Sequence, residues 1–189
     1  ELKHLLQSPF SLHSGMLAAI SREAEHARAG RSAAIIAKMN SLLEPQIIAA
    51  LYEASQAGVK IRLIIRGVCA LRPGVPGLSD NIEVRSVVGR FLEHPRVFYF
   101  YNDRQEDLYI ASADWMGRNF FRRIETCVPI RDTKLKRRVI KEGLRPYLFD
   151  NVNAWEMQGD GSYKRKTQRG KPRSAQAILL EELSSPTVR

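Results

Sequence analysis

The sequence contains only two cysteines, and no cysteine or histidine spacing in it is typical of a metal site. Cys69 and Cys127 each lie in or beside an apolar stretch, which predicts buried free thiols rather than a disulfide framework. The four histidines form no ligand cluster with these cysteines. The pattern therefore argues against zinc, and we assign no metal ligand.

Long apolar runs are also missing. No stretch approaches the length that crosses a bilayer, and the N-terminal residues lack a signal-peptide pattern. We therefore expect a cytoplasmic protein without a transmembrane segment, and we leave open a peripheral association with the inner membrane. Because the first residue is Glu1, we expect a fragment of a longer chain, with room for one domain or for one domain and a tail.

Acidic residues are scarce relative to basic ones. The chain has 20 Asp and Glu against 30 Lys and Arg, a formal net charge of +10, and Arg outnumbers Lys by 21 to 9. A guanidinium binds phosphate oxygens through two parallel hydrogen bonds, so this bias points to an anionic partner: a nucleotide, a polyanion or a nucleic acid. A solvated basic surface is the alternative interpretation.

The basic excess is concentrated in the last third of the chain. Residues 131–175 carry 13 Lys and Arg against 5 Asp and Glu, which is +8 of the total +10. Most of these charges lie on a predicted helix, Lys134–Arg145, and in the polar segment Lys164–Arg173. The pattern predicts either a solvated helix face and tail or a basic surface that guides a long polyanion toward a site.

Apolar periodicity predicts alternating strands and helices around an ordinary core. Pro45 suits the first turn of a helix and Gly58 its end, and buried strands at Ala33–Ala37 and Ile61–Ile65 flank that helix. A strand–helix–strand unit with short connections makes its two strands parallel neighbours. We expect an α/β fold with a mixed sheet flanked by helices. The other predicted strands are Glu83–Val87, Val97–Tyr101, Leu108–Ala111 and Ile124–Val128, and the other predicted helices are Met16–Ala29, Lys134–Arg145, which ends near Pro146, and Ala175–Leu183.

His94 is the first candidate for chemistry. It lies two residues before Arg96 and directly before a predicted strand. An imidazole beside a permanent cation suits phosphoryl transfer, because the ring moves a proton or accepts the phosphoryl group while the guanidinium holds phosphate oxygens. A surface histidine next to Pro95 is the alternative.

Further candidates lie where predicted strands end. Arg66 follows the strand Ile61–Ile65 and precedes Gly67, and Lys38 follows the preceding strand. Ligands of open α/β sheets bind beyond the carboxyl ends of parallel strands, so these cations are candidate phosphate contacts. Arg85, Arg90 and Arg118 complete a basic set around His94. The alternative for Arg66 is an arginine that caps a strand and pairs with a surface acid, and the alternative at the end of the preceding strand is that Asn40 or Ser41 only shapes the turn before the helix.

Asp114 is the candidate that orients the histidine. It follows the predicted strand Leu108–Ala111 and alternates with Ser112, so both side chains are expected to point to one side. A carboxylate hydrogen-bonded to an imidazole fixes its tautomer.

These residues resemble the histidine motif of the phospholipase D superfamily. That superfamily usually shows His-x-Lys, an Asp five residues after the lysine, and a later Gly-Ser-x-Asn. Here Arg96 stands at the lysine position, Tyr101 at the Asp position, and Ser112-Ala113-Asp114 follows the hairpin.

The departures point to one branch of that superfamily. From Leu5 to about Tyr163 the chain closely resembles the C-terminal domain of the polyphosphate kinase family. The phrases that carry the resemblance are Ile36-Ala-Lys-Met-Asn-Ser-Leu42, Ala57-Gly-Val-Lys-Ile61, Arg66-Gly67, Leu71-Arg-Pro-Gly-Val-Pro-Gly-Leu78, Val88-Gly-Arg-Phe-Leu-Glu-His-Pro-Arg96 and Ser112-Ala-Asp-Trp-Met116.

The resemblance implies a phospholipase D-like fold and a function. Enzymes of this family transfer the terminal phosphate of ATP to polyphosphate, reversibly and with Mg²⁺, through a phosphohistidine on the penultimate of four domains. This chain resembles the last domain, so the phosphohistidine and most Mg²⁺ contacts are expected upstream of it. By residue match, His94 is the second catalytic histidine and an ATP contact, and Arg66 is another ATP contact. Lys38, Arg90 and Arg118 are implied as further phosphate contacts.

The resemblance also defines the expected partners and domain limits. They are ATP or ADP, inorganic polyphosphate and the upstream domains of the same chain; a homo-oligomer stays open and DNA is not expected. We assign residues 1–158 to the phospholipase D-like domain and residues 159–189 to a basic loop with a short terminal helix. Two alternatives remain: a single-motif phospholipase D-like nuclease that acts as a dimer, and a non-catalytic polyanion-binding module.

Overall fold

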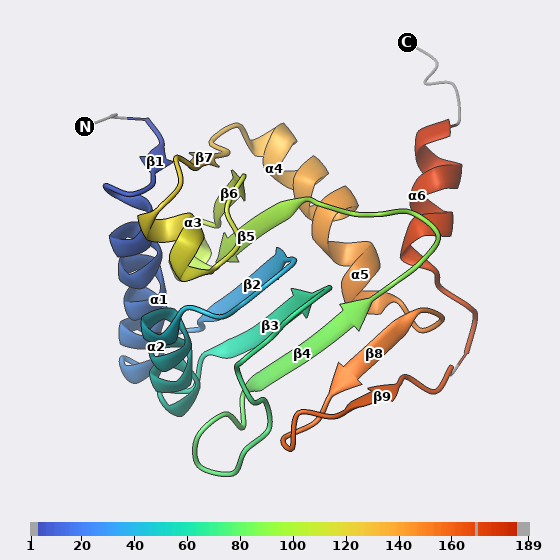
Figure 1. Cartoon of the computed structure of the whole chain (residues 1–189), viewed down its shortest axis with the longest axis horizontal. Coiled ribbons are helices and arrows are strands. Elements are labelled where there is room, and N and C mark those ends of the chain that lie inside the picture. Colours follow the sequence, from blue (N-terminus) through green and yellow to red (C-terminus); the bar gives the residue numbers. More distant parts are fainter. Residues whose placement is uncertain (1–3, 169, 185–189) are drawn as a thin grey trace.

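A computed structural model describes residues 4–168 and 170–184. The parts of the predicted domain 1–158 and of the predicted C-terminal segment 159–189 that fall on the other residues lie outside this description. Nine strands form one sheet in the order β1-β7-β6-β5-β2-β3-β4-β8-β9, and helices pack on both faces (Figure 1). In the described part of the chain, no helix is long and apolar enough to cross a membrane.

The helices and strands follow the predicted alternation through the first two thirds of the chain. The helices are α1 (Leu12–Arg28), α2 (Pro45–Gln56), α3 (Gly117–Phe121), α4 (Thr133–Val139), a π-helical turn (Ile140–Leu144), α5 (Arg145–Phe149) and α6 (Ala175–Ser184). The strands are β1 (Leu6–Gln7), β2 (Ala34–Met39), β3 (Lys60–Ile65), β4 (Ile82–Val87), β5 (Arg96–Phe100), β6 (Asp107–Ala111), β7 (Thr126–Pro129), β8 (Ala154–Met157) and β9 (Tyr163–Arg165).

The centre of the sheet is parallel and its flanks are antiparallel. Strand β3 pairs in parallel with both β2 and β4, as the strand–helix–strand pattern predicted. Strand β5 runs antiparallel to β2, with Val97 opposite Lys38. The start of β5 therefore lies beside the carboxyl end of β2, and the mixed α/β sheet predicted from the sequence is confirmed.

Alternating side chains on the central strands pack into two hydrophobic cores, one on each face of the sheet. On one face, Ile35, Ala37 and Met39 of β2 pack with α1, α2 and the buried Trp115. On the other face, Ile36 of β2 packs with residues of β5, α5 and α6. The period-two alternation of a strand sends neighbouring residues to opposite faces, so both layers of helices are held by the same strands.

Local capping fixes where α2 begins. Pro45 occupies the first turn, where its missing N–H removes no helical hydrogen bond. The Glu44 carboxylate accepts the Ile47 N–H at 2.7 Å, which satisfies one of the free donors at the helix start. This places the connection after β2 tightly against the sheet.

In the last third of the chain, α6 confirms the predicted helix Ala175–Leu183, but the elements before it differ from the prediction. The helix predicted to end near Pro146 continues through the π-helical turn to Phe149, because Pro146 lies in the first turn of α5, where proline is tolerated. The strands β8 and β9 were missed because they are short and lie at the edge of the sheet. The predicted boundary between residues 158 and 159 falls in the hairpin that joins them, and β9 belongs to the segment predicted as a basic loop.

The two cysteines are free, as predicted. Cys127 is buried and Cys69 is half-buried. Burial raises the pKa of Cys69 to about 11 and that of Cys127 to about 12. Because the thiolate is the reactive form, neither thiol is suited to nucleophilic chemistry at neutral pH.

Candidate functional site

The site lies at the edge where the parallel strands end. Met39 at the end of β2 is opposite Ile65 at the end of β3. Just beyond them, the Gly67 N–H donates to the Asn40 carbonyl oxygen at 2.9 Å. A Cβ on Gly67 would lie 2.9 Å from that oxygen, so the approach of the two backbones requires glycine.

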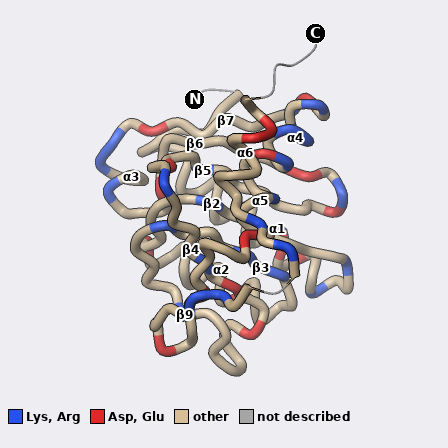
Figure 2. The backbone as a smooth tube through the Cα atoms, turned by 90° about the vertical axis from the view of Figure 1, so that its right-hand side faces the viewer, with Lys and Arg blue, Asp and Glu red and all other residues tan. Residues whose placement is uncertain are grey.

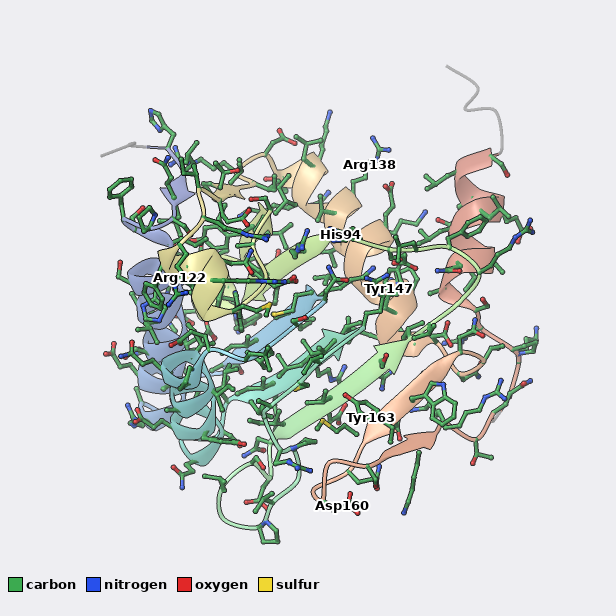
Figure 3. The ribbon with its side chains drawn as sticks, in the orientation of Figure 1. His94, Arg122, Arg138, Tyr147, Asp160 and Tyr163 are labelled. Carbon is green, nitrogen blue, oxygen red and sulfur yellow. The ribbon has the colours of Figure 1, made fainter. Side chains whose placement is uncertain are left out.

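His94 and Arg96 meet at this edge. His94 is exposed, and it closes the β4–β5 loop close to the part of α5 that carries Tyr147 (Figure 3). Arg96 Nη1 lies 2.5 Å from His94 Nδ1 and 3.2 Å from the His94 carbonyl oxygen. A guanidinium can only donate, so Nδ1 accepts, and the proton of the neutral ring lies on Nε2.

Asp114 holds Arg96 rather than His94. Arg96 Nε and Nη2 donate to the two carboxylate oxygens of Asp114 at 3.1 and 3.0 Å. Asp114 is 6% exposed and also accepts the Asn40 N–H at 2.7 Å. The prediction that Asp114 contacts the imidazole directly is therefore corrected: the guanidinium stands between them. Because the Asp114 carboxylate accepts three hydrogen bonds, it fixes the position of Arg96, and Arg96 in turn fixes the imidazole ring of His94.

Arg66 is an unpaired cation at this edge of the sheet. It directly follows β3 and is half-buried, and its backbone is held by hydrogen bonds to Met39 and from Ser86. Within residues 4–168 and 170–184, its guanidinium has no hydrogen-bond or ion-pair partner. Arg118, in α3, is exposed and likewise has none among these residues. Both guanidinium groups are accessible to an anion, and their contact with phosphate stays a prediction.

Lys38 is placed differently. It lies on the α5 face of β2 and is 5% exposed, with Nζ 2.7 Å from Glu93 Oε2 and 3.0 Å from the centre of the Tyr147 ring. Burial lowers the pKa of Lys38 to about 8, and Glu93 opposes that shift. The ammonium is already paired, so the structure does not offer Lys38 as the free phosphate contact that the sequence predicted.

The other two arginines of the predicted set also differ in placement. Arg85 is buried and donates to the carbonyl oxygens of Tyr147 and Leu148, so it satisfies the last turn of α5. Arg90 is exposed on the β4–β5 loop and lies over the Phe91 ring, 5.6 Å from its centre. Arg85 therefore has a structural role, while Arg90 remains available.

Sequence reasoning missed three residues behind the histidine: Glu93, Tyr147 and Gln176. Glu93 accepts hydrogen bonds from Lys38, Tyr147 and Gln176. Burial raises the pKa of Glu93, but these hydrogen bonds outweigh it and the net pKa is lowered. The acidic residue next to His94 was the one signal available in the sequence. Two of its three partners, Lys38 and Gln176, lie 55 and 83 residues away and leave no local pattern.

The basic residues of the last third of the chain are distributed over two regions. Figure 2 shows basic residues at α4 and again at β9, on separate parts of the surface. A cavity of about 270 Å³ is lined by Lys141, Arg145 and Arg173, and one of about 690 Å³ is lined by Arg173, Lys171 and Lys166, so that Arg173 borders both. Acidic residues share both cavities, and Lys166 Nζ is 2.5 Å from Glu156 Oε1.

The described side chains contain no group of three or more His, Cys, Asp or Glu residues that fits a metal ion. Asp114 is fully occupied by Arg96 and the Asn40 N–H. The residues at this edge therefore do not fit a divalent cation, and no chemical step is assigned to one here.

Three comparisons with known proteins agree. The family model described as polyphosphate kinase C-terminal domain 2 matches residues 5–176. Proteins named polyphosphate kinase from Paraburkholderia phytofirmans and Burkholderia multivorans are each 60% identical to this chain, over 98% and 97% of its length. The chain spans 27% of the length of each of these relatives.

Solved structures give the same result. The crystal structure of polyphosphate kinase from Porphyromonas gingivalis aligns with a TM-score of 0.92 and 38% identity, covering 97% of this chain and 28% of that one. A phospholipase D family member from Salmonella typhimurium aligns with a TM-score of 0.57 and 16% identity, over 82% of this chain and 96% of that one. The second likeness concerns the fold alone.

Proposed function

Because the chain belongs to the polyphosphate kinase family, we propose that it is the part of such an enzyme that assists transfer of the terminal phosphate of ATP to inorganic polyphosphate. The transfer is reversible and passes through a phosphohistidine outside this chain. ATP or ADP, polyphosphate and the upstream domains are its partners. Mg²⁺, held mainly upstream, offsets phosphate charge, and use of ATP fits a cytoplasmic enzyme.

His94 acts as a proton donor in this proposal. The carrying observation is that Arg96 donates to His94 Nδ1, which leaves the ring proton on Nε2. An imidazole in this state donates a hydrogen bond from Nε2 to a phosphoryl or leaving-group oxygen, and it delivers a proton only after the ring has become an imidazolium. The phosphorylated nitrogen must instead carry a lone pair, which supports the assignment of the phosphohistidine to another domain.

Arg66 stabilises phosphate charge in the proposed site. Its unpaired guanidinium follows the parallel strand β3, at the sheet edge where ligands of open α/β sheets bind. Phosphoryl transfer depends on positioning and on neutralising the equatorial oxygens, and an arginine does both. Arg118 and Arg90 are proposed as outer contacts with the same phosphates.

The two alternatives fit the geometry less well. A phospholipase D-like nuclease needs a nucleophilic histidine, whereas here Nδ1 accepts and Nε2 carries the proton. A non-catalytic polyanion-binding module gives no role to the three hydrogen bonds that hold Asp114 and, through it, the Arg96–His94 pair.

The test is made in the full-length enzyme with ATP, Mg²⁺ and a polyphosphate primer. His94→Ala and His94→Gln should each lower turnover by about a hundredfold to ten-thousandfold, because neither delivers a proton. His26→Gln is the matched control, since His26 contacts Asn102, which follows β5 at the opposite edge of the sheet from His94. The 189-residue chain alone should not extend the primer. Near-normal turnover of both His94 variants, or robust synthesis by the chain alone, contradicts the proposal.

A further inference from the structure

The loop that carries His94 is held by α6. From the end of β4 the chain reaches across to α6 before it returns to β5 (Figure 1). Gln176, in the first turn of α6, donates through Nε2 to the Phe91 carbonyl oxygen at 2.8 Å. The Phe91 N–H donates back to Gln176 Oε1 at 2.9 Å. One side-chain amide thus pairs with both backbone groups of Phe91, as a neighbouring strand would.

The same amide also contacts the residue next to the histidine. Gln176 Nε2 lies 2.8 Å from Glu93 Oε1, while the other oxygen of Glu93 binds Lys38. Lys38 belongs to the central strand β2 and is buried under Tyr147. The residue before His94 is therefore anchored at once to the sheet, to α5 and to α6.

The start of α6 is itself fixed. Ala175 is fully buried, and its N–H donates to Asp150 Oδ2 at 2.7 Å. Asp150 directly follows α5 and is also fully buried. Gln176 therefore projects from a fixed point, and its amide can restrain the exposed part of the loop around Phe91.

We propose that Gln176 is a positioning residue, which fixes the β4–β5 loop and through it the place of His94. The proposal rests on the proposed function of His94. A displacement of a catalytic group by about 1 Å can lower the rate of the reaction on the order of a hundredfold. The free loop would sample such displacements, and the amide removes them.

Gly89 permits this contact. A Cβ at Gly89 would lie 2.4 Å from Gln176 Oε1 and 2.7 Å from its Cδ. Both atoms belong to the far end of a flexible side chain, so an alanine at position 89 displaces the amide and leaves the backbone where it is. Gly89→Ala therefore breaks the same contact from the loop side, without a change in α6.

The experiment uses the full-length enzyme with Gln176→Ala, Gly89→Ala and the double variant. Gln56→Ala is the matched control, because Gln56 also lies in a terminal turn of a helix and donates to a loop carbonyl, that of Gly77, away from the histidine. Each single variant should lower kcat by about tenfold with less than a twofold change in the KM for ATP. The double variant should match the singles, since residues in one contact are not additive. Hydrogen exchange of residues 88–95 should accelerate in all three.

Two results would overturn the proposal: kcat that stays normal while loop exchange accelerates, or losses that multiply in the double variant. The activity of the His94→Ala enzyme distinguishes failure of the positioning role of Gln176 from failure of the proposed function of His94. If His94→Ala is fully active, the catalytic role of His94 fails and its positioning fails with it. If His94→Ala is inactive and the Gln176 and Gly89 variants have normal kcat, only the positioning role fails.

Discussion

Replacing Asp114 with alanine should destabilise the chain and release the guanidinium that holds His94. Asp114 accepts two hydrogen bonds from Arg96 and one from the Asn40 N–H, and the Asp114 and Arg96 side chains are 8% and 11% exposed. Removing one partner of a buried ion pair costs about 3–5 kcal/mol, because the other charge stays buried without compensation. For a chain of this size, that lowers Tm by about 6–20 °C.

The isosteric variant Asp114→Asn separates the effect of the carboxylate charge from the effect of the side-chain shape. Asp114→Asn keeps one carbonyl oxygen but turns an NH₂ group toward a donor, either the guanidinium or the Asn40 N–H. We expect a loss of about 1–3 kcal/mol, the cost of a buried donor left unsatisfied. In the full-length enzyme both variants should lower kcat, because Arg96 no longer has the geometry that keeps the His94 ring proton on Nε2.

Asp107→Ala is the control for this pair. Asp107 accepts from Arg22 Nη2 at 2.6 Å, but these side chains are 28% and 36% exposed. A partly solvated pair of this kind contributes about 0–1 kcal/mol. Thermal unfolding of the chain, followed by circular dichroism, measures all three variants. Equal Tm shifts for Asp114→Ala and Asp107→Ala would refute the argument from burial.

Two further predictions concern phosphate binding. In the full-length enzyme, Arg66→Lys should raise the KM for ATP and lower turnover although the charge is kept, because lysine lacks the paired donors; steady-state kinetics measure this, and unchanged values remove Arg66 from the site. Replacing Lys164, Arg165 and Lys166 with Gln should weaken binding of long-chain polyphosphate and flatten its salt dependence, with little change for ATP, because fewer counterions are released. Titration at several salt concentrations measures this, and an unchanged affinity and slope mean that the segment is only a solvated tail.

The sequence was most informative where one periodicity dominated. Apolar runs located β2 to β7, and the single helix between β2 and β3 was enough to predict that these strands are parallel. That in turn predicted the edge where Arg66 and His94 lie. The prediction succeeded because strand direction and chain connection determine which ends meet, whatever the side chains do.

Side-chain partners were less predictable, for a physical reason. Lys38 and Arg66 both follow or end parallel strands, yet one is buried against Glu93 and the other is free. The difference arises from helix α5, which covers Lys38 with Tyr147. No local pattern encodes which long-range element covers a given strand end, so position alone suggested the same role for both cations.

The C-terminal segment shows the same limit. Its polar, basic composition is typical of a loop, but β9 completes the sheet and α6 contacts the histidine loop 85 residues earlier in the chain. The composition of such a segment is dominated by its solvent-exposed residues, so it does not reveal which few residues pack against the rest of the protein. The few residues that anchor it, Ala175 and Gln176, are too sparse to produce a periodic signal.

The arginine at position 96 has a chemical consequence that the geometry makes explicit. A lysine there would present one rotating ammonium, which cannot bind both oxygens of Asp114 and still hold His94 Nδ1 in a fixed plane. The guanidinium does both with separate nitrogens, Nε and Nη2 toward the carboxylate and Nη1 toward the ring. It thereby supplies a donor where a nucleophilic histidine would have an acceptor such as a carboxylate. The departure from the His-x-Lys pattern and the proposed role of His94 as a hydrogen-bond donor through Nε2 therefore have the same cause.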